Sequence, residues 1–244
     1  MIKEIAFDKA KEYFDNLKEK VIFAYEIFED SKNKNFGIYN EDVLCGIIFG
    51  NNDFYYLFLD DNYSDIEEIK LFLKVNFVKE IISNRRFEIS SEKIYYFLVK
   101  KADDKNIKSI YYYPFENNME KIKLQYKLLK QCNFSLPGFD EFYLSLFYKN
   151  KKDVLRLYGI FSDGLCVCSA IISYMKDNIA KLTSIATSPE YRKMGLAEKI
   201  LKDIFYDEKL KSKDICLLCG NEKALNLYNK VGFEIKEILY VYEL

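Results

Sequence analysis

The chain has 244 residues, enough for one large domain or two small ones, and its apolar (50%) and charged (31%) fractions are typical of a folded protein. Its 37 basic and 38 acidic residues leave a net charge of −1, so the composition gives no support to a nucleic-acid partner. The complete lack of histidine excludes Ser-His-Asp and Cys-His catalysis and histidine-ligated zinc.

Membrane segments and cysteine chemistry can be judged from the same sequence. No run approaches the ~20 apolar residues of a membrane span, and the N-terminus lacks the long apolar stretch of a signal peptide. Four of the six cysteines lie in apolar runs, where cysteine behaves as a small buried hydrophobe. The motif Cys216-x-x-Cys219 has no second pair, and on a strand its two side chains point to opposite faces. We therefore expect a cytoplasmic protein with reduced thiols, no membrane contact and no metal site.

The first hundred residues predict helices alternating with short strands. The segment 21–28 is apolar throughout, and its pattern fits a helix and a strand equally well. A helix is expected from Ser64, as its cap, to Lys74. The remaining elements are a helix at 8–19 and strands at 35–39, 43–50, 54–60, 78–82 and 94–99. A polar run at 102–106 is a candidate domain boundary.

The pattern then restarts in a similar order. Strands are expected at 107–113, 154–161, 165–174, 179–186, 214–218 and 233–241, and helices at 117–131, 139–148, 195–206 and 222–230. This order predicts a mixed α+β domain at 105–244, with a mostly antiparallel sheet flanked by helices. The looser repeat of the same order at 1–104 predicts a diverged N-terminal α/β domain and so a tandem arrangement.

The segment TSPEYRKMGLAEKIL carries the clearest chemistry. In it a predicted strand leads through a short turn into a helix at Gly195. Helix N-termini expose backbone N–H groups, and the helix dipole favours anions there. Gly195 lets a phosphate approach the backbone, small Ala197 keeps the next turn open, and Arg192 and Lys193 add positive charge. The segment predicts a pyrophosphate-binding turn; the plainer alternative is a turn glycine beside a solvated arginine.

A second segment, NEKALNLYNKVGF, is weaker on its own. Asn221, Ala224, Leu225 and Tyr228 fall on one face of a helix. Asn221 also fits an ordinary helix cap, and Tyr228 fits a core aromatic residue.

Together the two segments resemble the GNAT superfamily of acyl-CoA N-acyltransferases over about residues 105–244, although the glycine which that family often has after Leu196 is Ala197 here. The resemblance implies acetyl-CoA as co-substrate, in a V-shaped opening between the strand that ends at Ala186 and the strand at 214–218. It also implies direct attack by a primary amine through a tetrahedral intermediate, with Tyr228 as the general acid that protonates the thiolate. The residues implied for cofactor binding are Ile185, Ala186 and Thr187 along the pantetheine arm, Arg192, Lys193, Met194, Gly195, Leu196 and Ala197 around the pyrophosphate, and Asn221 near the thioester.

Several alternatives stay open at this point. The general base is Asp140, Glu141, Tyr174 or a water chain, and the acceptor amine is not identified. The N-terminal region lacks the R-x-x-G-x-[GA] motif, because Arg85 and Arg86 are followed by no glycine. That region either shapes the acceptor site or mediates a homodimer. The rival function is a non-catalytic acyl-CoA-binding sensor or scaffold.

Overall fold

The computed structural model describes residues 1–17, 24–28, 34–51, 53–61, 63–88, 91–102 and 110–244. The chain forms two compact units. Unit 1 comprises Met1–Leu98, Leu218–Glu222 and Ile235–Leu244, and unit 2 comprises Val99–Leu217 and Lys223–Glu234. This division differs from the single boundary predicted near residue 104, because two segments of the C-terminal part pack with the N-terminal unit.

Unit 1 is built on strands β1 to β5, in which β1–β2, β2–β3 and β3–β4 pair antiparallel and β4–β5 pair parallel. Helices α1 and α3 lie between β1 and β2 in the chain, and α3 makes the segment 21–28 helical over its described part. The elements are β1 (Ile2–Glu4), α1 (Phe7–Asn16), α3 (Tyr25–Phe28), β2 (Lys34–Asn40), β3 (Val43–Asn51), β4 (Phe54–Leu59), α4 (Ile66–Val75), β5 (Glu80–Ser83) and β6 (Glu92–Lys100).

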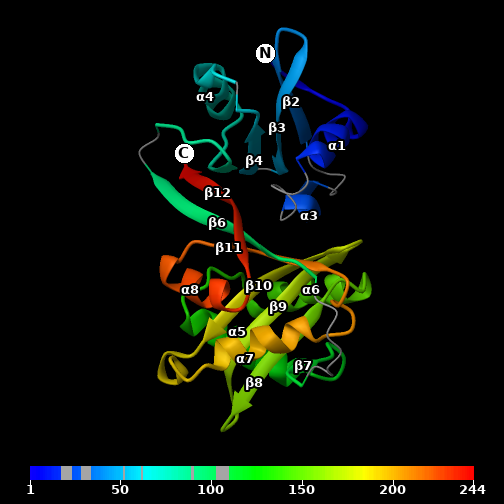
Figure 1. Ribbon diagram of the computed structural model, residues 1–244, viewed down its shortest axis with the longest axis vertical. Helices are drawn as coiled ribbons and strands as arrows, with labels where there is room; N and C mark the ends of the chain where they lie inside the picture. The colour runs from blue at the N-terminus through cyan, green and yellow to red at the C-terminus, as the bar shows by residue number, and fades with distance from the viewer. Residues whose placement is uncertain (18–23, 29–33, 52, 62, 89–90, 103–109) are drawn as a thin grey trace. The chain divides into compact units, whose positions relative to one another are not determined.

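From β7 to β11, unit 2 repeats the order of helices and strands found from β1 to β5 (Figure 1). The strand directions repeat as well, but the helix α8 follows β11 whereas the strand β6 follows β5. β7–β8, β8–β9 and β9–β10 pair antiparallel, and β10–β11 pair parallel. The elements are β7 (Tyr112–Tyr113), α5 (Met119–Gln131), α6 (Phe139–Lys151), β8 (Arg156–Ser162), β9 (Leu165–Lys176), β10 (Ile179–Thr187), the 3-10 turn η2 (Pro189–Tyr191), α7 (Leu196–Phe205), β11 (Asp214–Cys219) and α8 (Glu222–Lys230). The matching pattern confirms the predicted mixed α+β class and supports the tandem arrangement.

The C-terminal strand β12 (Glu234–Glu243) completes unit 1 rather than unit 2. It pairs antiparallel with β5, where Tyr240 lies opposite Ser83 and Tyr242 opposite Ile81. Because these pairs hold the last residues against the N-terminal sheet, they explain why no single cut in the sequence separates the two units.

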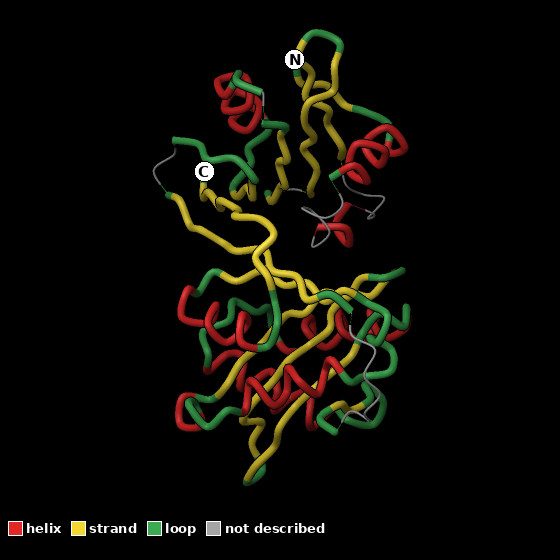
Figure 2. The backbone as a smooth tube through the Cα atoms, in the orientation of Figure 1, coloured by secondary structure: helices red, strands yellow, loops and turns green. Residues whose placement is uncertain are grey.

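Helices cover both faces of the unit 2 sheet (Figure 2). Neighbouring residues on a strand point to opposite faces. Leu157 in β8 packs into the apolar cluster of α5 and α6, whereas the next residue, Tyr158, donates its hydroxyl to Asp207 just after α7. α5 and α6 therefore lie on one face, and α7 lies on the other.

One local prediction needs correction. α4 is capped by Asp65, whose carboxylate accepts from the N–H of Glu68, and not by Ser64. On α5 the buried face includes the polar residue Gln125, while Tyr126 is half-buried. Most of the polar run 102–106 lies outside the described residues.

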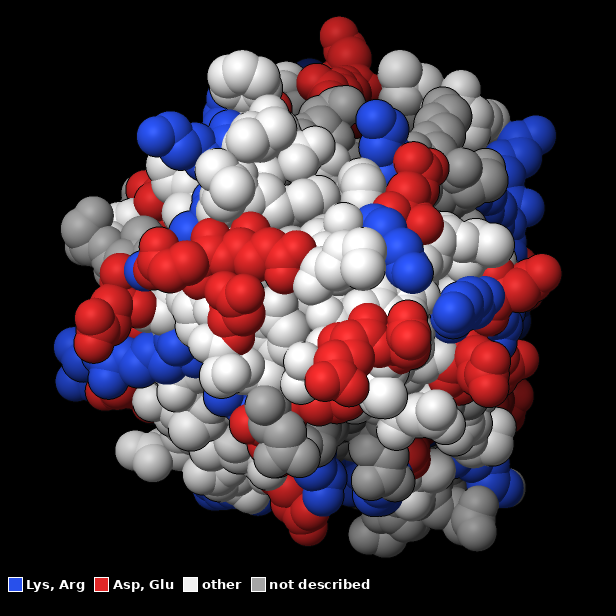
Figure 3. Space-filling model, turned by 90° about the horizontal axis from the view of Figure 1, so that it is seen from above, with Lys and Arg blue, Asp and Glu red and all other residues white. Residues whose placement is uncertain are grey.

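The surface carries both signs of charge. On the face seen in Figure 3, acidic and basic side chains lie next to each other, in keeping with the net charge of −1. Among the described helices, none has the length and apolar character needed to cross a membrane.

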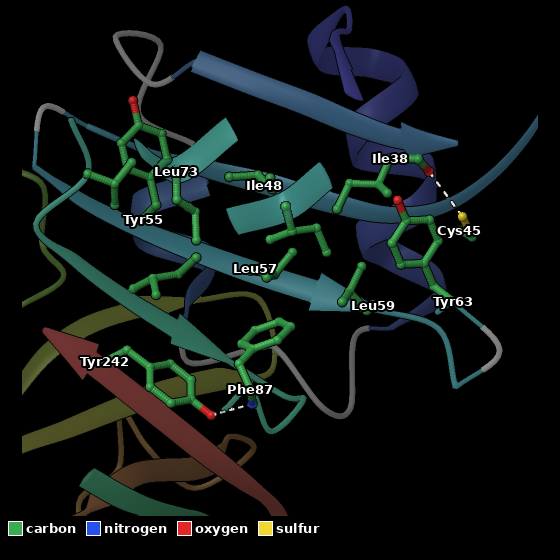
Figure 4. Packing of buried hydrophobic residues seen from close by; sticks show 13 residues of the cluster. Ile38, Cys45, Ile48, Tyr55, Leu57, Leu59, Tyr63, Leu73, Phe87 and Tyr242 are labelled. Carbon is green, nitrogen blue, oxygen red and sulfur yellow. Dashed lines mark hydrogen bonds between the residues drawn. The ribbon is translucent and has the colours of Figure 1, made fainter. Parts of the chain in front are cut away.

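Tyr242 anchors β12 in the core of unit 1 (Figure 4). Its side chain is fully buried, its oxygen accepts from the N–H of Phe87 at 2.7 Å, and its hydroxyl donates to Glu92 at 3.2 Å. Burial raises the pKa of Tyr242 to about 12, and the charge of Glu92 acts in the same direction. A raised pKa means that this tyrosine stabilises the fold fully below pH 10 and that the contribution is lost as pH rises through about 12.

We expect Tyr242→Phe to lower the free energy of unfolding by about 1 kcal/mol at pH 8, because the buried N–H of Phe87 loses its acceptor. The variant is also expected to lose less stability than the wild type between pH 10 and 12. Urea denaturation at pH 8 and at pH 11 measures both effects, with Tyr240→Phe on the same strand as the control. Equal pH dependence in Tyr242→Phe and the wild type would show that Tyr242 does not set the alkaline limit.

Candidate functional site

The strands β10 and β11 run side by side for only a short distance. The recorded pairs are Ile179 with Asp214, Ala180 with Ile215 and Lys181 with Cys216. Within the described residues β10 continues to Thr187 and stays paired with β9 on its other edge. A strand that outlasts its neighbour can offer its backbone to an extended ligand, as in strand addition. The predicted residues Ile185, Ala186 and Thr187 lie on this part of β10.

A short ordered turn connects β10 to α7. The N–H of buried Ser188 donates to Val167, and η2 follows from Pro189. The exposed Arg192 side chain returns to the end of β10, where its Nε donates to the carbonyl of Thr187 at 3.2 Å. Arg192 therefore braces the turn in addition to adding a positive charge.

The predicted anion site lies at the start of α7, where the backbone takes an unusual conformation. Lys193 (φ +65°) and Gly195 (φ +75°) are both left-handed, and Gly195 is the N-cap of α7 with no side-chain cap. The first helical bond runs from Lys199 N–H to the Gly195 carbonyl, so the amides of the first turn precede the helical ladder. A Cβ placed on Gly195 would meet no atom within 4 Å, so open space lies in front of this turn. Met194 beside it is 60% exposed.

An ion-pair bridge joins the two helices that carry the predicted site. Glu198, in the first turn of α7, accepts from Lys202 at 2.7 Å and from Lys230 of α8 at 2.6 Å. These two lysine hydrogen bonds lower the pKa of Glu198 to about 2. The bridge therefore persists over the whole physiological pH range.

Tyr228 is buried on α8, with its ring edge-on to Phe233 at 5.8 Å. This is the packing expected of a core aromatic residue, so the structure leaves its role as general acid a proposal. Asn221 is exposed and directly precedes α8, the position of a helix cap. It belongs to the segment that packs with unit 1, and its contact with a ligand also remains a proposal.

The candidate general bases are not distinguished by the fold. Asp140 and Glu141 are exposed in the first turn of α6, where the helix dipole stabilises the negative charge of carboxylates. Tyr174 is half-buried in β9.

The cysteines behave as buried hydrophobes. All six are free, and five of them are buried. Burial raises the pKa of Cys166 and Cys216 to about 12, so neither is a thiolate at neutral pH. No group of three or more Cys, Asp or Glu within the described part of the chain is arranged to hold a metal ion.

Sequence reasoning missed one feature of this region. Ser184 lies in β10 with φ +54°, inside a bulge opposite β9. A serine in a strand gives no sequence signal for such a backbone.

Comparisons with known proteins bear on the family and the fold of this chain. Residues 155–235 match the family model described as acetyltransferase (GNAT) domain, while no curated protein matches the chain. Solved structures that share the fold include the following three. An acetyltransferase of the GNAT family from Colwellia psychrerythraea is 11% identical with a TM-score of 0.59, covering 100% of this chain and 99% of its own. A GCN5-related N-acetyltransferase from Sphaerobacter thermophilus is 8% identical with a TM-score of 0.68, covering 100% and 95%. A GCN5-related N-acetyltransferase-like protein from Streptococcus suis is 11% identical with a TM-score of 0.52, covering 98% and 99%.

Both units fall within these alignments, so the similarity extends to the tandem architecture. At these identities the neighbours establish the fold alone, and the family match covers residues 155–235, which contain the strand, turn and helix described above. Residues 155–235 thus match a GNAT acetyltransferase domain, and the chain as a whole shares the fold of the GNAT structures.

Proposed function

We propose that this protein transfers an acetyl group from acetyl-CoA to a primary amine. The single observation that carries the proposal is the left-handed turn at Lys193 and Gly195 at the start of α7. The turn faces open space, and it directly follows β10, which extends beyond its pairing with the parallel strand β11. Acyl transfer from acetyl-CoA is the chemistry of the family, and the amine acceptor is our own inference.

In this proposal the amides from Arg192 to Ala197 hold the pyrophosphate. Open space at Gly195 admits the phosphate oxygens, and the dipole of α7 stabilises their charge. Arg192 keeps the turn closed against Thr187, and Lys193 adds a surface charge. The pantetheine arm then lies along Ile185, Ala186 and Thr187 as an added strand, with Asn221 near the thioester.

The reaction requires the protein to position both substrates, to donate a hydrogen bond to the oxyanion, to protonate the thiolate and to accept the proton of the amine. A neutral amine attacks the thioester carbonyl and forms a tetrahedral intermediate, whose oxyanion accepts from a backbone N–H near Ala186. Collapse of the intermediate expels the thiolate, which Tyr228 protonates as general acid. Asp140, Glu141, Tyr174 or water takes the proton from the amine.

Unit 1 has an equivalent turn between β4 and α4, and its chemistry is unsuited to phosphate. Asp65 already caps α4 with its own carboxylate, and Asp60 and Asp61 lie in the same turn. Arg85 donates from Nη1 to the backbone carbonyls of Asp60 and Asp61. We therefore assign acyl-CoA to unit 2 alone; unit 1 either shapes the acceptor site or forms a homodimer contact.

Calorimetric titration with acetyl-CoA and with free CoA tests the proposal. We expect binding of both ligands in the micromolar range, followed by CoA release when a library of primary amines is added. A folded protein that binds neither ligand would remove the proposal.

Tyr228→Phe separates an enzyme from a binding module. If Tyr228 is the general acid, we expect kcat to fall by about 100-fold while the Kd for acetyl-CoA changes less than twofold. Steady-state thiol release and calorimetry measure the two quantities, and Tyr206→Phe, at the end of α7, is the control.

Unchanged turnover in Tyr228→Phe would contradict this role and leave Tyr228 as the core residue that its packing on Phe233 suggests. Tight binding of acetyl-CoA without turnover of any amine by the wild type would favour the sensor or scaffold function.

A further inference from the structure

The bulge in β10 contains one residue more than β9 offers opposite it. Thr183 lies opposite Ile171 and Ala186 opposite Ser169, so β10 spans two intervening residues where β9 has one. Ser184, inside this bulge, takes the left-handed conformation that a non-glycine residue rarely adopts. The two bulge residues are Ser184 and Ile185, so the bulge includes the first residue of the segment proposed to bind pantetheine and leads directly into the other two, Ala186 and Thr187.

A buried chain of hydrogen bonds ends on the bulge. The Ser169 hydroxyl donates to the carbonyl of Ser184 at 3.2 Å and accepts from Gln125 Nε2 at 2.7 Å. The hydroxyl of Tyr113 donates to Gln125 Oε1 at 2.6 Å. Ser169 and Gln125 are fully buried, and Tyr113 is 4% exposed.

The direction of this chain is fixed by its surroundings. Gln125 Nε2 also donates to the carbonyl of Tyr158 at 3.1 Å, and a carbonyl can only accept. The amide nitrogen of Gln125 must therefore face the sheet, which leaves Ser169 as acceptor from Gln125 and donor to Ser184. Removing the polar group of Tyr113, Gln125 or Ser169 leaves a buried polar group without its hydrogen-bond partner.

We propose that Tyr113, Gln125 and Ser169 are positioning residues that hold the left-handed bulge of β10, and with it the backbone that receives the pantetheine arm. This inference rests on the proposed function. Without the Ser169 hydrogen bond, the left-handed backbone of Ser184 loses a contact that stabilises it. The end of β10 would then change direction, and its backbone groups would no longer be aligned with the pantetheine arm.

Ser169→Ala tests the proposal. We expect it to fold and to bind acetyl-CoA about tenfold more weakly, as expected for one lost buried hydrogen bond. Binding of 3′-phospho-ADP, the nucleotide half of CoA, is expected to stay within twofold, because it reaches only the turn at Gly195. Tyr113→Phe, at the far end of the chain, is expected to show a smaller loss of about threefold and serves if Ser169→Ala does not fold.

Thr183→Val is the matched control. Thr183 Oγ1 donates to the carbonyl of Ile171 at 3.3 Å, a bond between the same two strands but outside the bulge. We expect its loss to leave acetyl-CoA binding unchanged. Adding Ser184→Gly to Ser169→Ala is expected to restore most of the affinity, because glycine adopts φ +54° without support.

Wild-type affinity in Ser169→Ala, an equal loss in Thr183→Val, an equal loss for 3′-phospho-ADP or a failed rescue by Ser184→Gly would each overturn the proposal. If the wild type binds no acyl-CoA, the proposed function fails by itself. The bulge is then tested in the free protein, where Ser169→Ala should move the amide NMR signals of Ser184 and Ile185 more than Thr183→Val does; equal shifts would overturn it.

Discussion

Gly195→Glu is expected to raise the Kd for acetyl-CoA by at least 100-fold, or about 3 kcal/mol of binding free energy. The turn at Gly195 faces open space, so the new side chain occupies the volume that the pyrophosphate needs. Its carboxylate also lies where the amides of α7 are expected to stabilise a ligand's negative charge. Both effects act on the ligand, and calorimetric titration of the variant with acetyl-CoA measures their sum.

The backbone offers a close control for this experiment. Gly164, in the turn between β8 and β9, has φ +74° against +75° at Gly195, and it too faces open space. Gly164→Glu therefore introduces the same left-handed strain and the same charge at another place in unit 2. We expect Gly164→Glu to bind acetyl-CoA as the wild type does, and equal losses in the two variants would show that Gly195 has no special part in binding.

The C-terminal part of the fold was predictable because its motifs combine local and periodic signals. The strand at 179–186, the glycine turn and the apolar face of the helix after it all point to the same structure, and each appears at the expected residues. Gln125 was detectable in principle. It falls three residues after Ile122 and four before Leu129, in the middle of an apolar stripe, where a polar residue needs a buried partner.

Two features could not be read from the sequence. The exchange of the last strand into unit 1 depends on pairing between β5 and β12, about 160 residues apart in the chain, and no local pattern encodes such a partner. The left-handed backbone of Ser184 depends on a hydrogen bond from Ser169 in the neighbouring strand. Both are consequences of tertiary contacts rather than of intrinsic preference.

Arg156 forms a buried ion pair with Asp207 that joins β8 to the end of α7. Its Nε and Nη2 donate to the Asp207 carboxylate at 3.2, 2.9 and 2.7 Å, and its guanidinium carbon lies 3.6 Å from the centre of the Tyr112 ring. The side chain of Asp207 is 1% exposed and that of Arg156 is 13% exposed. The chain has only four arginines among 37 basic residues. At this position the planar guanidinium donates two nitrogens to one carboxylate and stacks on an aromatic ring, and a lysine ammonium can do neither.

Arg156→Met is expected to lower the free energy of unfolding by about 3–4 kcal/mol, because it leaves the Asp207 carboxylate buried without its cation. Arg156→Lys keeps the charge but loses the fork and the stacking on Tyr112, so we expect a smaller loss of about 1–2 kcal/mol. Urea denaturation followed by circular dichroism measures both losses.

Lys209→Met is the control, because it removes a nearby but exposed ion pair with Asp153, and it is expected to lower the free energy of unfolding by less than about 1 kcal/mol. Combining Arg156→Met with Asp207→Leu removes both charges and should recover part of the loss, because no buried carboxylate then remains unpaired. A loss in Arg156→Met no larger than that in Lys209→Met would show that the pair does not hold α7 on the sheet.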